Sequence, residues 1–442
     1  MSGKADTICA IATPPGRGGV GVIRVSGPES ATLVESLCGA LPSPRRAALR
    51  TLGDRDGEPI DQALILRFTA PRSFTGEDVV EIQTHGSPVV LELILAELVA
   101  GGARRARPGE FSERAFLNDR IDLAQAEAIA DLIDATSAQA ARAASRSLEG
   151  ALSKEADELA ARVTELRVWV EAALDFADED VDFLADGQVR DRTEALVRAL
   201  DALLARTRSG RLLIDGLRVA IVGKPNAGKS SLLNALTRSE TAIVTEQPGT
   251  TRDVLRERIA IAGIPITLAD TAGLRETSDT IEAEGVRRAQ QEMRQADLLL
   301  WVVEAGESAP RLPPGLDGEP PFIRINNKID ISGDRPRIDE QGVWLSLMTG
   351  EGLELLEDSV RRKLDLNSDA GGEFSARQRH VEALTTARRH LAAGLAEISA
   401  TGSGELLAEC LKDSANSLGE ITGRLSSDEL LGQIFSSFCI GK

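Results

Sequence analysis

The hydrophobic positions of this 442-residue chain follow three different patterns in succession. Over residues 1–119, short apolar runs alternate with amphipathic stretches, and the Pro14–Pro15 and Gly101–Gly102 pairs mark turns. The pattern predicts strands at Thr7–Ala12, Gly19–Val25, Ala63–Phe68 and Asp78–Thr84, and helices near Glu29–Cys38 and Pro88–Ala100. We therefore predict an α+β domain over residues 1–119.

The second pattern is helical and covers residues 120–212. Leucine and valine recur at steps of three, four and seven residues from Leu148 to Leu174, which places them on one face of long helices. The run Asp175–Asp186 contains six carboxylates and predicts a solvated loop between helices. The helical pattern returns over residues 371–442, after a polar linker at Ser368–Gly372. We predict one all-α domain made of these two segments.

The third pattern lies between the helical segments, over residues 213–370. Its apolar runs are short, continuous and separated by helical stretches, as in strands buried in a parallel sheet. The predicted strands are Leu217–Val222, Ile264–Ala269, Leu298–Val303 and Phe322–Asn326. The chain is thus predicted to be multidomain, with an α/β domain inserted into an all-α domain and an α+β domain before both.

Charge and composition narrow the functional classes. The chain carries 51 Lys plus Arg against 69 Asp plus Glu, a net charge of −18, which argues against a general nucleic-acid-binding surface. Four cysteines and three histidines are scattered, so neither a zinc site nor a disulfide framework is expected. No apolar run approaches the roughly 18 residues of a membrane span. Because the start of the chain lacks a secretory core, we expect a cytoplasmic protein.

A phosphate-binding loop is predicted at Gly223–Ser230, with the sequence GKPNAGKS. It follows a predicted strand and opens a predicted helix, so backbone N–H groups can turn inward around phosphates at a helix N-terminus. In such a loop Lys229 reaches the β- and γ-phosphates, and the Ser230 hydroxyl binds Mg²⁺. The context makes an ordinary glycine turn a weak alternative.

Two later segments complete the predicted nucleotide site, and the second of them specifies guanine. Asp270-Thr-Ala-Gly273 follows one predicted strand, where Asp270 acts on Mg²⁺ through water and the Gly273 N–H contacts the γ-phosphate. Asn327-Lys-Ile-Asp330 follows another, and the Asp330 carboxylate can accept from both the ring N–H and the exocyclic amine of guanine. Adenine presents the opposite pattern there. The four motifs together predict a P-loop, Ras-like G domain, with Thr251 of the segment Gly249–Asp253 as a second Mg²⁺ ligand.

The residue that orients the attacking water in Ras-like switches is absent. Leu274 stands in the position of that glutamine. The neighbouring carboxylates Glu276, Asp279, Glu282 and Glu284 are expected to be mainly solvated charges of the switch loop. Asn226 offers another solution, because its side-chain carbonyl beside the phosphates could hold a monovalent cation that supplies positive charge. A loop-capping role for Asn226 is the alternative.

Two further motifs lie near the ends of the chain. Gly16–Gly21 fits GxGxxG, but a predicted strand rather than a helix follows it, so a dinucleotide site is not expected. The chain ends in Phe438-Cys-Ile-Gly-Lys442. Prenylation of Cys439 fits poorly, because Gly441 is not aliphatic and no polybasic stretch precedes it. A buried helical cysteine is the simpler expectation.

These motifs together resemble one family. The segments are Thr13–Gly21 (TPPGRGGVG), Gly76–Glu81 (GEDVVE), Asn118–Glu127 (NDRIDLAQAE), the GTP motifs and the FCIGK end. Over essentially the whole chain they are similar to the MnmE (TrmE) family of tRNA uridine-modification GTPases, within the TrmE-Era-EngA-like GTPases. The resemblance implies an N-terminal folate-binding and dimerisation domain (1–119), a helical domain (120–212 and 371–442) and a G domain (213–370).

The resemblance also implies a reaction and its partners. The family binds 5-formyl- or 5,10-methylene-tetrahydrofolate as a homodimer. With the FAD-dependent partner MnmG, in a heterotetramer, it adds an aminomethyl or carboxymethylaminomethyl group to the wobble uridine of certain tRNAs. The folate contacts fall by motif match on Arg24, Glu81, Arg120 and Lys442. Arg120 stands where the family usually has Lys, which keeps the charge and changes the geometry.

For GTP hydrolysis, the resemblance implies G domains that dimerise across the nucleotide and bind K⁺. The K⁺ ligands fall on Asn226, Thr245, Gln247 and Thr250, and the catalytic residues are Glu282 as general base through water, Lys229 and Asn226. Cys439 is a candidate functional thiol, with structural packing as the alternative. The full predicted GTP-binding set is Gly223, Asn226, Ala227, Gly228, Lys229, Ser230, Ser231, Thr245, Glu246, Gln247, Pro248, Gly249, Thr250, Thr251, Asp270, Thr271, Ala272, Gly273, Asn327, Lys328 and Asp330.

Two other functions compete with a K⁺-stimulated GTPase of a tRNA-modifying complex. One is a GTP-switch ribosome-assembly factor that binds rRNA without modification chemistry, although such factors carry a basic RNA-binding module. The other is a folate-binding transferase with a regulatory G domain. Residues 120–212 and 213–370 each carry a net charge of −7, and residues 1–119 and 371–442 each carry −2. This distribution predicts that the chain alone binds tRNA weakly and shares it with a partner.

Overall fold

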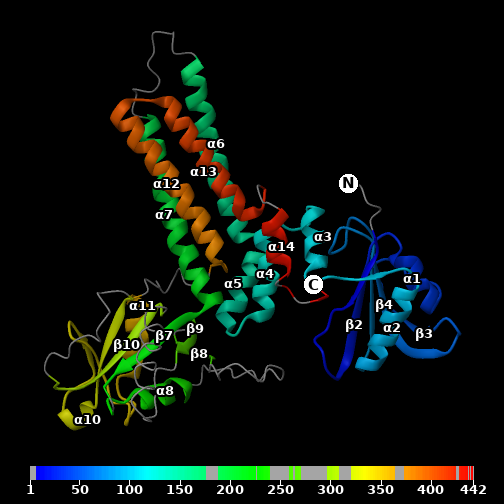
Figure 1. Cartoon of the computed structure of the whole chain (residues 1–442), viewed down its shortest axis with the longest axis horizontal. Coiled ribbons are helices and arrows are strands. Elements are labelled where there is room, and N and C mark those ends of the chain that lie inside the picture. The colour runs from blue at the N-terminus through cyan, green and yellow to red at the C-terminus, as the bar shows by residue number, and fades with distance from the viewer. Residues whose placement is uncertain are drawn as a thin grey trace, which may run out of the picture. The chain divides into compact units, whose positions relative to one another are not determined.

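The computed structural model describes residues 6–175, 188–224, 226–238, 258–261, 264–269, 296–307, 320–363, 373–424, 428–436, 438 and 440–441. The chain forms two compact units (Figure 1). The first comprises Met1–Ala130 and Gly419–Lys442, and the second comprises Asp131–Leu418. Residues 120–130 and 419–442 therefore group with the N-terminal segment, whereas the sequence pattern assigned them to the helical domain.

The first unit contains a six-stranded sheet with strand order β3-β4-β5-β2-β1-β6. Its strands are β1 (Ile8–Ile11), β2 (Gly18–Ser26), β3 (Ala48–Gly53), β4 (Pro59–Phe68), β5 (Val79–Gly86) and β6 (Arg104–Arg105). All neighbours are antiparallel except β1 and β6. The four predicted strands and both predicted helices, α1 (Ser30–Cys38) and α2 (Pro88–Ala100), are confirmed. The helices pack with one face of the sheet.

Alternation along the strands decides which side chains reach that core. In β5, Val80 and Ile82 are buried in the cluster with α1 and α2, so Glu81 lies on the opposite face. In β2, Ile23 and Val25 are buried in the same cluster, and Arg24 shares the opposite face with Glu81. We call this opposite face the second face of the sheet. On it, Ile8 and Ala10 of β1 pack with Phe111. Arg24 and Glu81, two of the four residues that the sequence assigned to folate, have side chains that are 22% and 19% exposed there.

The end of the chain also packs in the first unit. Helix α14 (Asp428–Ser436) and Phe438 pack against α3 (Glu110–Leu117) and α4 (Leu123–Asp134) through Ile434, Phe435 and Leu123. The rings of Phe435 and Phe438 meet edge to face with centroids 5.5 Å apart. A side chain at Gly441 would lie 2.4 Å from the Ile11 carbonyl oxygen of β1, so the chain end runs against the sheet. This brings the C-terminal tail to the N-terminal segment.

A carboxylate buried among arginines fixes α3 to the sheet edge. The Glu110 side chain is 3% exposed and accepts hydrogen bonds from Arg104 at 2.5 Å and from the Arg107 backbone N–H at 2.7 Å. Burial alone would raise the pKa of Glu110, but the Arg104 hydrogen bond and charge lower it. The carboxylate is therefore ionised, and its pairing stabilises the folded unit at neutral pH.

Replacing Glu110 by Gln is expected to lower the free energy of unfolding of the chain by about 2–3 kcal/mol at pH 7, because three arginines, Arg104, Arg107 and Arg114, lose their buried partner. The folded pKa lies below the unfolded value of about 4.3, so this contribution is present above pH 4.3 and is lost as the pH falls through the folded pKa. Urea unfolding of both forms at pH 7 and pH 3.5 measures it. An unchanged midpoint at pH 7 would contradict the prediction. Glu113→Gln is the control, since Glu113 lies on the same helix, is more exposed and pairs only with Arg107 among the described residues.

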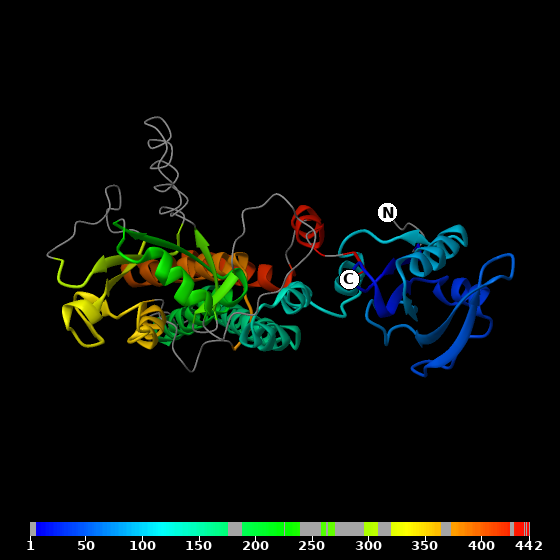
Figure 2. The same cartoon turned by 90° about the horizontal axis from the view of Figure 1, so that it is seen from below.

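The second unit contains a bundle of long helices. These are α5 (Ala138–Leu148), α6 (Ala151–Asp175), α7 (Gln188–Asp215), α12 (Gln378–Thr401) and α13 (Gly404–Thr422). Helices α7 and α12 lie side by side in both views (Figures 1 and 2). The predicted stripe from Leu148 to Leu174 lies on two helices, α5 and α6, which are separated at Glu149–Gly150, where Gly150 has φ 89°. The predicted acidic loop at residues 176–186 lies outside the described residues.

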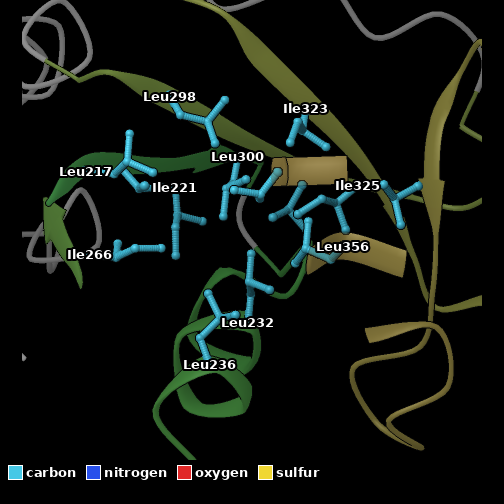
Figure 3. Packing of buried hydrophobic residues seen from close by; sticks show 14 of the residues in the cluster. Leu217, Ile221, Leu232, Leu236, Ile266, Leu298, Leu300, Ile323, Ile325 and Leu356 are labelled. Atoms are coloured by element: carbon cyan, nitrogen blue, oxygen red, sulfur yellow. The ribbon is translucent and has the colours of Figure 1, made fainter. Parts of the chain in front are cut away.

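A seven-stranded sheet with the order β12-β13-β11-β10-β7-β9-β8 forms the rest of this unit. The strands are β7 (Leu217–Gly223), β8 (Arg258–Ile261), β9 (Ile264–Ala269), β10 (Leu298–Glu304), β11 (Phe322–Asn327), β12 (Arg337–Asp339) and β13 (Gly342–Trp344). The four predicted strands are confirmed, and they pair in parallel. Leu232 and Leu236 of α8 (Lys229–Arg238) and Leu356 of α11 (Leu353–Lys363) pack on one face (Figure 3).

The chain enters and leaves this sheet beside the same two helices. It passes from α7 to β7 through Gly216 alone, and Leu212 and Leu213 of α7 belong to the sheet's core cluster, as does Ala143 of α5. On the return, Ser375 is fixed to α5: the Ser147 hydroxyl donates to the Ser375 carbonyl at 2.9 Å and accepts from its N–H at 2.8 Å. Both connections between the sheet and the helical bundle are therefore fixed to helices, the first to α7 and the second to α5.

Candidate functional site

The phosphate-binding loop has the strand–loop–helix context that the sequence predicted. Gly223 ends β7 opposite Val302 of β10, and Lys229 begins α8. Gly223 has φ 155°, and a Cβ there would lie 2.3 Å from the Val302 carbonyl oxygen. Gly228 has φ 110°, and a Cβ there would lie 2.3 Å from Asn327 Nδ2. Both glycines are required by close approach of neighbouring strands and loops.

Lys229 lies across this loop. Its Nζ donates to the carbonyl oxygens of Gly223 at 2.8 Å and Lys224 at 2.9 Å. Burial lowers the pKa of Lys229, although the ordinary value is high enough to keep the ammonium charged at neutral pH. Ser230 and Ser231 follow in the first turn of α8. A cation, two hydroxyls and a helix N-terminus thus meet at one loop, as anion binding requires.

Asn226 occupies the turn of the loop. It has φ 64°, a conformation that non-glycine residues adopt rarely and asparagine tolerates best. It is exposed, and the following Ala227 is buried. The conformation accounts for an asparagine at this position whether or not its side chain binds a cation.

The guanine-reading segment lies next to the loop. Asn327, at the end of β11, is buried and donates from Nδ2 to the Ala227 carbonyl at 2.8 Å, while its Oδ1 accepts from the Leu347 N–H at 3.1 Å. Asn327 therefore joins the phosphate loop to the loop Ser346–Gly350. Its structural role was not evident from the motif alone, because the partner groups are backbone atoms far away in sequence.

Asp330 projects from α10 (Ile329–Ser332) with one oxygen already fixed. Its Oδ1 accepts from the hydroxyl of the buried Ser346 at 2.5 Å. Lys328, with φ 72°, precedes it and pairs with Glu304. The Ser346 hydroxyl thus orients the Asp330 carboxylate. Asn327, Lys328 and Asp330 are thus brought together with Gly223–Lys229.

Several predicted site residues cannot be placed. Those outside the described residues are Thr245, Glu246, Gln247, Pro248, Gly249, Thr250, Thr251, Asp270, Thr271, Ala272, Gly273, Glu282, Cys439 and Lys442. Their roles stay predictions.

Among the residues predicted to bind folate, Arg24 and Glu81 are directly paired: Arg24 Nε donates to Glu81 Oε1 at 3.0 Å. The Arg24 guanidinium also lies 5.2 Å from the ring centre of Phe74 and 5.7 Å from that of Phe111.

Arg120 lies near the loop that leads into β5. A side chain at Gly76 would lie 3.2 Å from Arg120 Cγ, and Asn118 Nδ2 donates to the Thr75 carbonyl at 2.7 Å. The Arg120 side chain is exposed. The structure therefore places Arg120 against the segment five residues before Glu81.

The glycine loop with its lysine, beside an Asn-Lys-Ile-Asp loop on a parallel sheet, defines a P-loop GTP-binding protein. The family model described as "GTP-binding protein TrmE N-terminus" matches residues 7–120, and the model "MnmE helical domain" matches residues 123–439. The chain belongs to the MnmE family of tRNA modification GTPases. It is a GTPase that takes part in tRNA modification.

Two curated relatives give the extent of this similarity, and one solved structure also matches a part of the chain. The tRNA modification GTPase MnmE of Alkalilimnicola ehrlichii is 53% identical over 443 residues, 99% of each chain. That of Proteus mirabilis is 50% identical over 452 residues, 99% of this chain and 100% of its own. The G domain of the T. maritima FeoB iron transporter matches with a TM-score of 0.24 and 28% identity, over 33% of this chain and 98% of its own. No helix among the described residues is long and apolar enough to cross a membrane.

Proposed function

We propose that the chain is a K⁺-stimulated GTPase whose G domains (213–370) are activated by dimerisation, and that Mg²⁺ is bound by Ser230 and Thr251. The observation that supports the cation is Asn226, exposed in the turn of the phosphate loop that Lys229 crosses. A side-chain carbonyl there fits a monovalent cation, and Leu274 cannot orient water. Asn226, Thr245, Gln247 and Thr250 would hold K⁺, and Glu282 would act as general base through water.

Hydrolysis of GTP is expected to be at least about tenfold faster in KCl than in NaCl at equal ionic strength, since only K⁺ would fit the ligand set at the dimer contact. Phosphate release by the full chain measures the rate, and light scattering checks that dimers are intact. Asn226→Ala should remove the difference between the two salts while GTP binding persists. Equal rates in both salts with intact dimers would overturn the K⁺ proposal.

We further propose that residues 1–119 bind 5-formyl- or 5,10-methylene-tetrahydrofolate and that the chain acts in the cytoplasm as a homodimer with MnmG to add a (carboxymethyl)aminomethyl group at C5 of the tRNA wobble uridine. Support comes from the second face of the sheet, where Glu81 and the partly exposed Phe74 hold Arg24 over the buried ring of Phe111, with Arg120 on a neighbouring segment. An aromatic ring and guanidinium groups suit a flat heterocycle with an anionic tail. Calorimetric titration with 5-formyltetrahydrofolate tests the binding.

A further inference from the structure

The arginines of residues 6–120 fall into two groups. Six of them form ion pairs with carboxylates. Of the others, which form no ion pair with a described carboxylate, four lie near the start of β3 and the end of β4. These four residues, which we call the arginine patch, are Arg45, Arg46, Arg67 and Arg72. They belong to none of the sites described above.

Backbone and side-chain contacts hold the segments of the patch together. The Arg45 N–H donates to the Arg67 carbonyl at 2.8 Å, which joins the loop before β3 to the end of β4. The Arg45 guanidinium donates through Nη2 to the Arg72 carbonyl at 2.6 Å and lies 5.8 Å from the ring centre of Phe68. A proline directly precedes both Arg45 and Arg72 and restricts the backbone there. The two loops therefore present their arginines from a well-defined backbone.

Most of the hydrogen-bond donors of the patch are unused. Arg45, Arg46 and Arg72 are exposed, and Arg67 is half-buried. Each guanidinium group carries five N–H donors, of which Arg45 uses one for the Arg72 carbonyl. No described residue accepts a hydrogen bond from the other three side chains, and the Nε of Arg67 is buried without such a partner. Planar donors of this kind suit phosphate oxygens, which they can bind two at a time.

The segments that carry the patch contain no carboxylate. Residues 39–50 and 62–75 include five arginines and no Asp or Glu, although 69 of the 442 residues of the chain are acidic. The fifth arginine, Arg50, donates to two backbone carbonyl oxygens. One carboxylate from outside these segments, Asp78, accepts from the Ala70 N–H at 2.8 Å. The four arginines therefore exceed it by three positive charges.

The acidic end of the β3–β4 hairpin is far from the patch. Its carboxylates lie within residues 54–61, at and beside the hairpin tip. Six residues of β4 separate Asp61 from Arg67, which corresponds to about 20 Å of strand. Exposed charges more than about 10 Å apart are largely screened at about 0.1 M salt. The positive charge of the patch is therefore not cancelled by the tip.

We propose that the arginine patch binds the phosphate backbone of tRNA, the molecule whose modification this GTPase serves. The proposal does not depend on the folate or K⁺ functions. The net charge of −18 argues against a general nucleic-acid-binding surface, but residues 120–370 carry most of it, so a local basic surface on the first unit is compatible with it. Phosphate contacts position an RNA without reading its sequence. Four charges give weak, salt-sensitive binding, as expected for a chain that shares tRNA with a partner.

Reversal of two charges in the full chain tests the patch. Arg46→Glu combined with Arg72→Glu is expected to weaken binding of a tRNA transcript with uridine at the wobble position at least about tenfold at about 50 mM KCl, because repulsion replaces two phosphate contacts. The slope of log affinity against log salt concentration should become shallower by about two. Arg46→Lys combined with Arg72→Lys should keep the affinity within about threefold, since lysine binds phosphate as a point charge. Fluorescence anisotropy over a salt series measures both quantities.

Arg55→Glu combined with Arg105→Glu is the matched control. It changes the net charge equally at two exposed arginines of the same unit, each of which already pairs with a carboxylate. The tRNA affinity of this control should stay within about twofold of wild type. Thermal unfolding and GTP hydrolysis check that all variants are folded.

Three results would overturn the proposal. Equal losses in the two charge-reversed variants would mean that net charge, rather than the patch, governs binding. A wild-type chain without salt-dependent tRNA binding would reject the patch as a tRNA site. So would an Arg46→Glu, Arg72→Glu variant that binds tRNA normally and instead loses affinity for 5-formyltetrahydrofolate in calorimetry or its oligomeric state in light scattering, because the arginines would then serve an anionic folate tail or a contact between copies.

Discussion

Replacing Asp330 by Asn is expected to lower the affinity for GTP about a thousandfold and to create affinity for xanthosine triphosphate. Guanine presents a ring N–H and an exocyclic amine, and the Asp330 carboxylate can accept from both. Asparagine keeps one acceptor and presents an amine that faces the amine of guanine. Two donors opposite each other cost several kcal/mol, which corresponds to about three powers of ten in affinity.

Xanthine carries a carbonyl where guanine carries the exocyclic amine, so the asparagine side chain of the Asp330→Asn variant restores a complementary pair. Competition titration of the two nucleotides measures the switch. Asp334→Asn is the matched control, because Asp334 lies four residues further on and pairs with Ser332 and Arg337 at the surface. Undiminished GTP affinity in Asp330→Asn would show that this carboxylate does not read the base. Ser346→Ala should weaken GTP binding more mildly, since it frees the carboxylate without removing it.

Lys229→Met is expected to weaken GTP binding at least about a hundredfold and to abolish measurable hydrolysis. The Lys229 ammonium donates to the carbonyl oxygens of Gly223 and Lys224 in the phosphate-binding loop. In P-loop proteins the lysine at this position contacts the β- and γ-phosphates of the nucleotide. Methionine keeps the length of the side chain and removes its charge. A charged hydrogen bond to a phosphate is among the stronger polar contacts, and its loss leaves the phosphate charge uncompensated.

Lys224 provides the matched control within the same loop. Its ammonium is exposed and pairs with Glu307, so Lys224→Met should change GTP affinity by less than about threefold. Equilibrium titration with a fluorescent GTP analogue and single-turnover hydrolysis compare the two variants. Equal losses in both would mean that general positive charge, rather than the position of Lys229, holds the nucleotide. Thermal unfolding of each variant checks that the fold is intact.

The sequence predicted most of the elements that carry the nucleotide site. Continuous apolar runs such as Leu217–Val222 and Leu298–Val303 can bury both faces only in a covered parallel sheet, and they form β7 and β10. The phosphate loop follows because its glycines and lysine directly succeed the first of these runs. Motif spacing then specified Asn327–Asp330. At this site the hydrophobic runs and the nucleotide-binding motifs predict the same strands and loops, so the sequence alone was sufficient to predict these elements.

The remaining features depend on contacts between residues far apart in the chain. The C-terminal helix α14 is amphipathic like its neighbours, and only its packing against α3 and α4 assigns it to the first unit. The spacing of the leucines alone does not indicate the break between α5 and α6 at Gly150. The orientation of Asp330 by Ser346 and of His85 by Asp61 joins residues 16 and 24 positions apart. A hydroxyl or carboxylate gives no sequence signal of such a partner.

The way the GTP-binding sheet is inserted into the helices has a mechanical consequence. A domain that is joined to the rest of a protein by one flexible connection can rotate about it. A conformational change inside such a domain is then not transmitted to the rest of the protein. Here one support is the short passage from α7 to β7, and the other is Ser375 fixed to Ser147. Because both connections are fixed, we expect a shift of Gly223 to displace the C-terminal end of α7. This helix has 28 residues and is about 42 Å long. By its length alone, a tilt of about 5° at one end of such a helix corresponds to a displacement of roughly 4 Å at the other end.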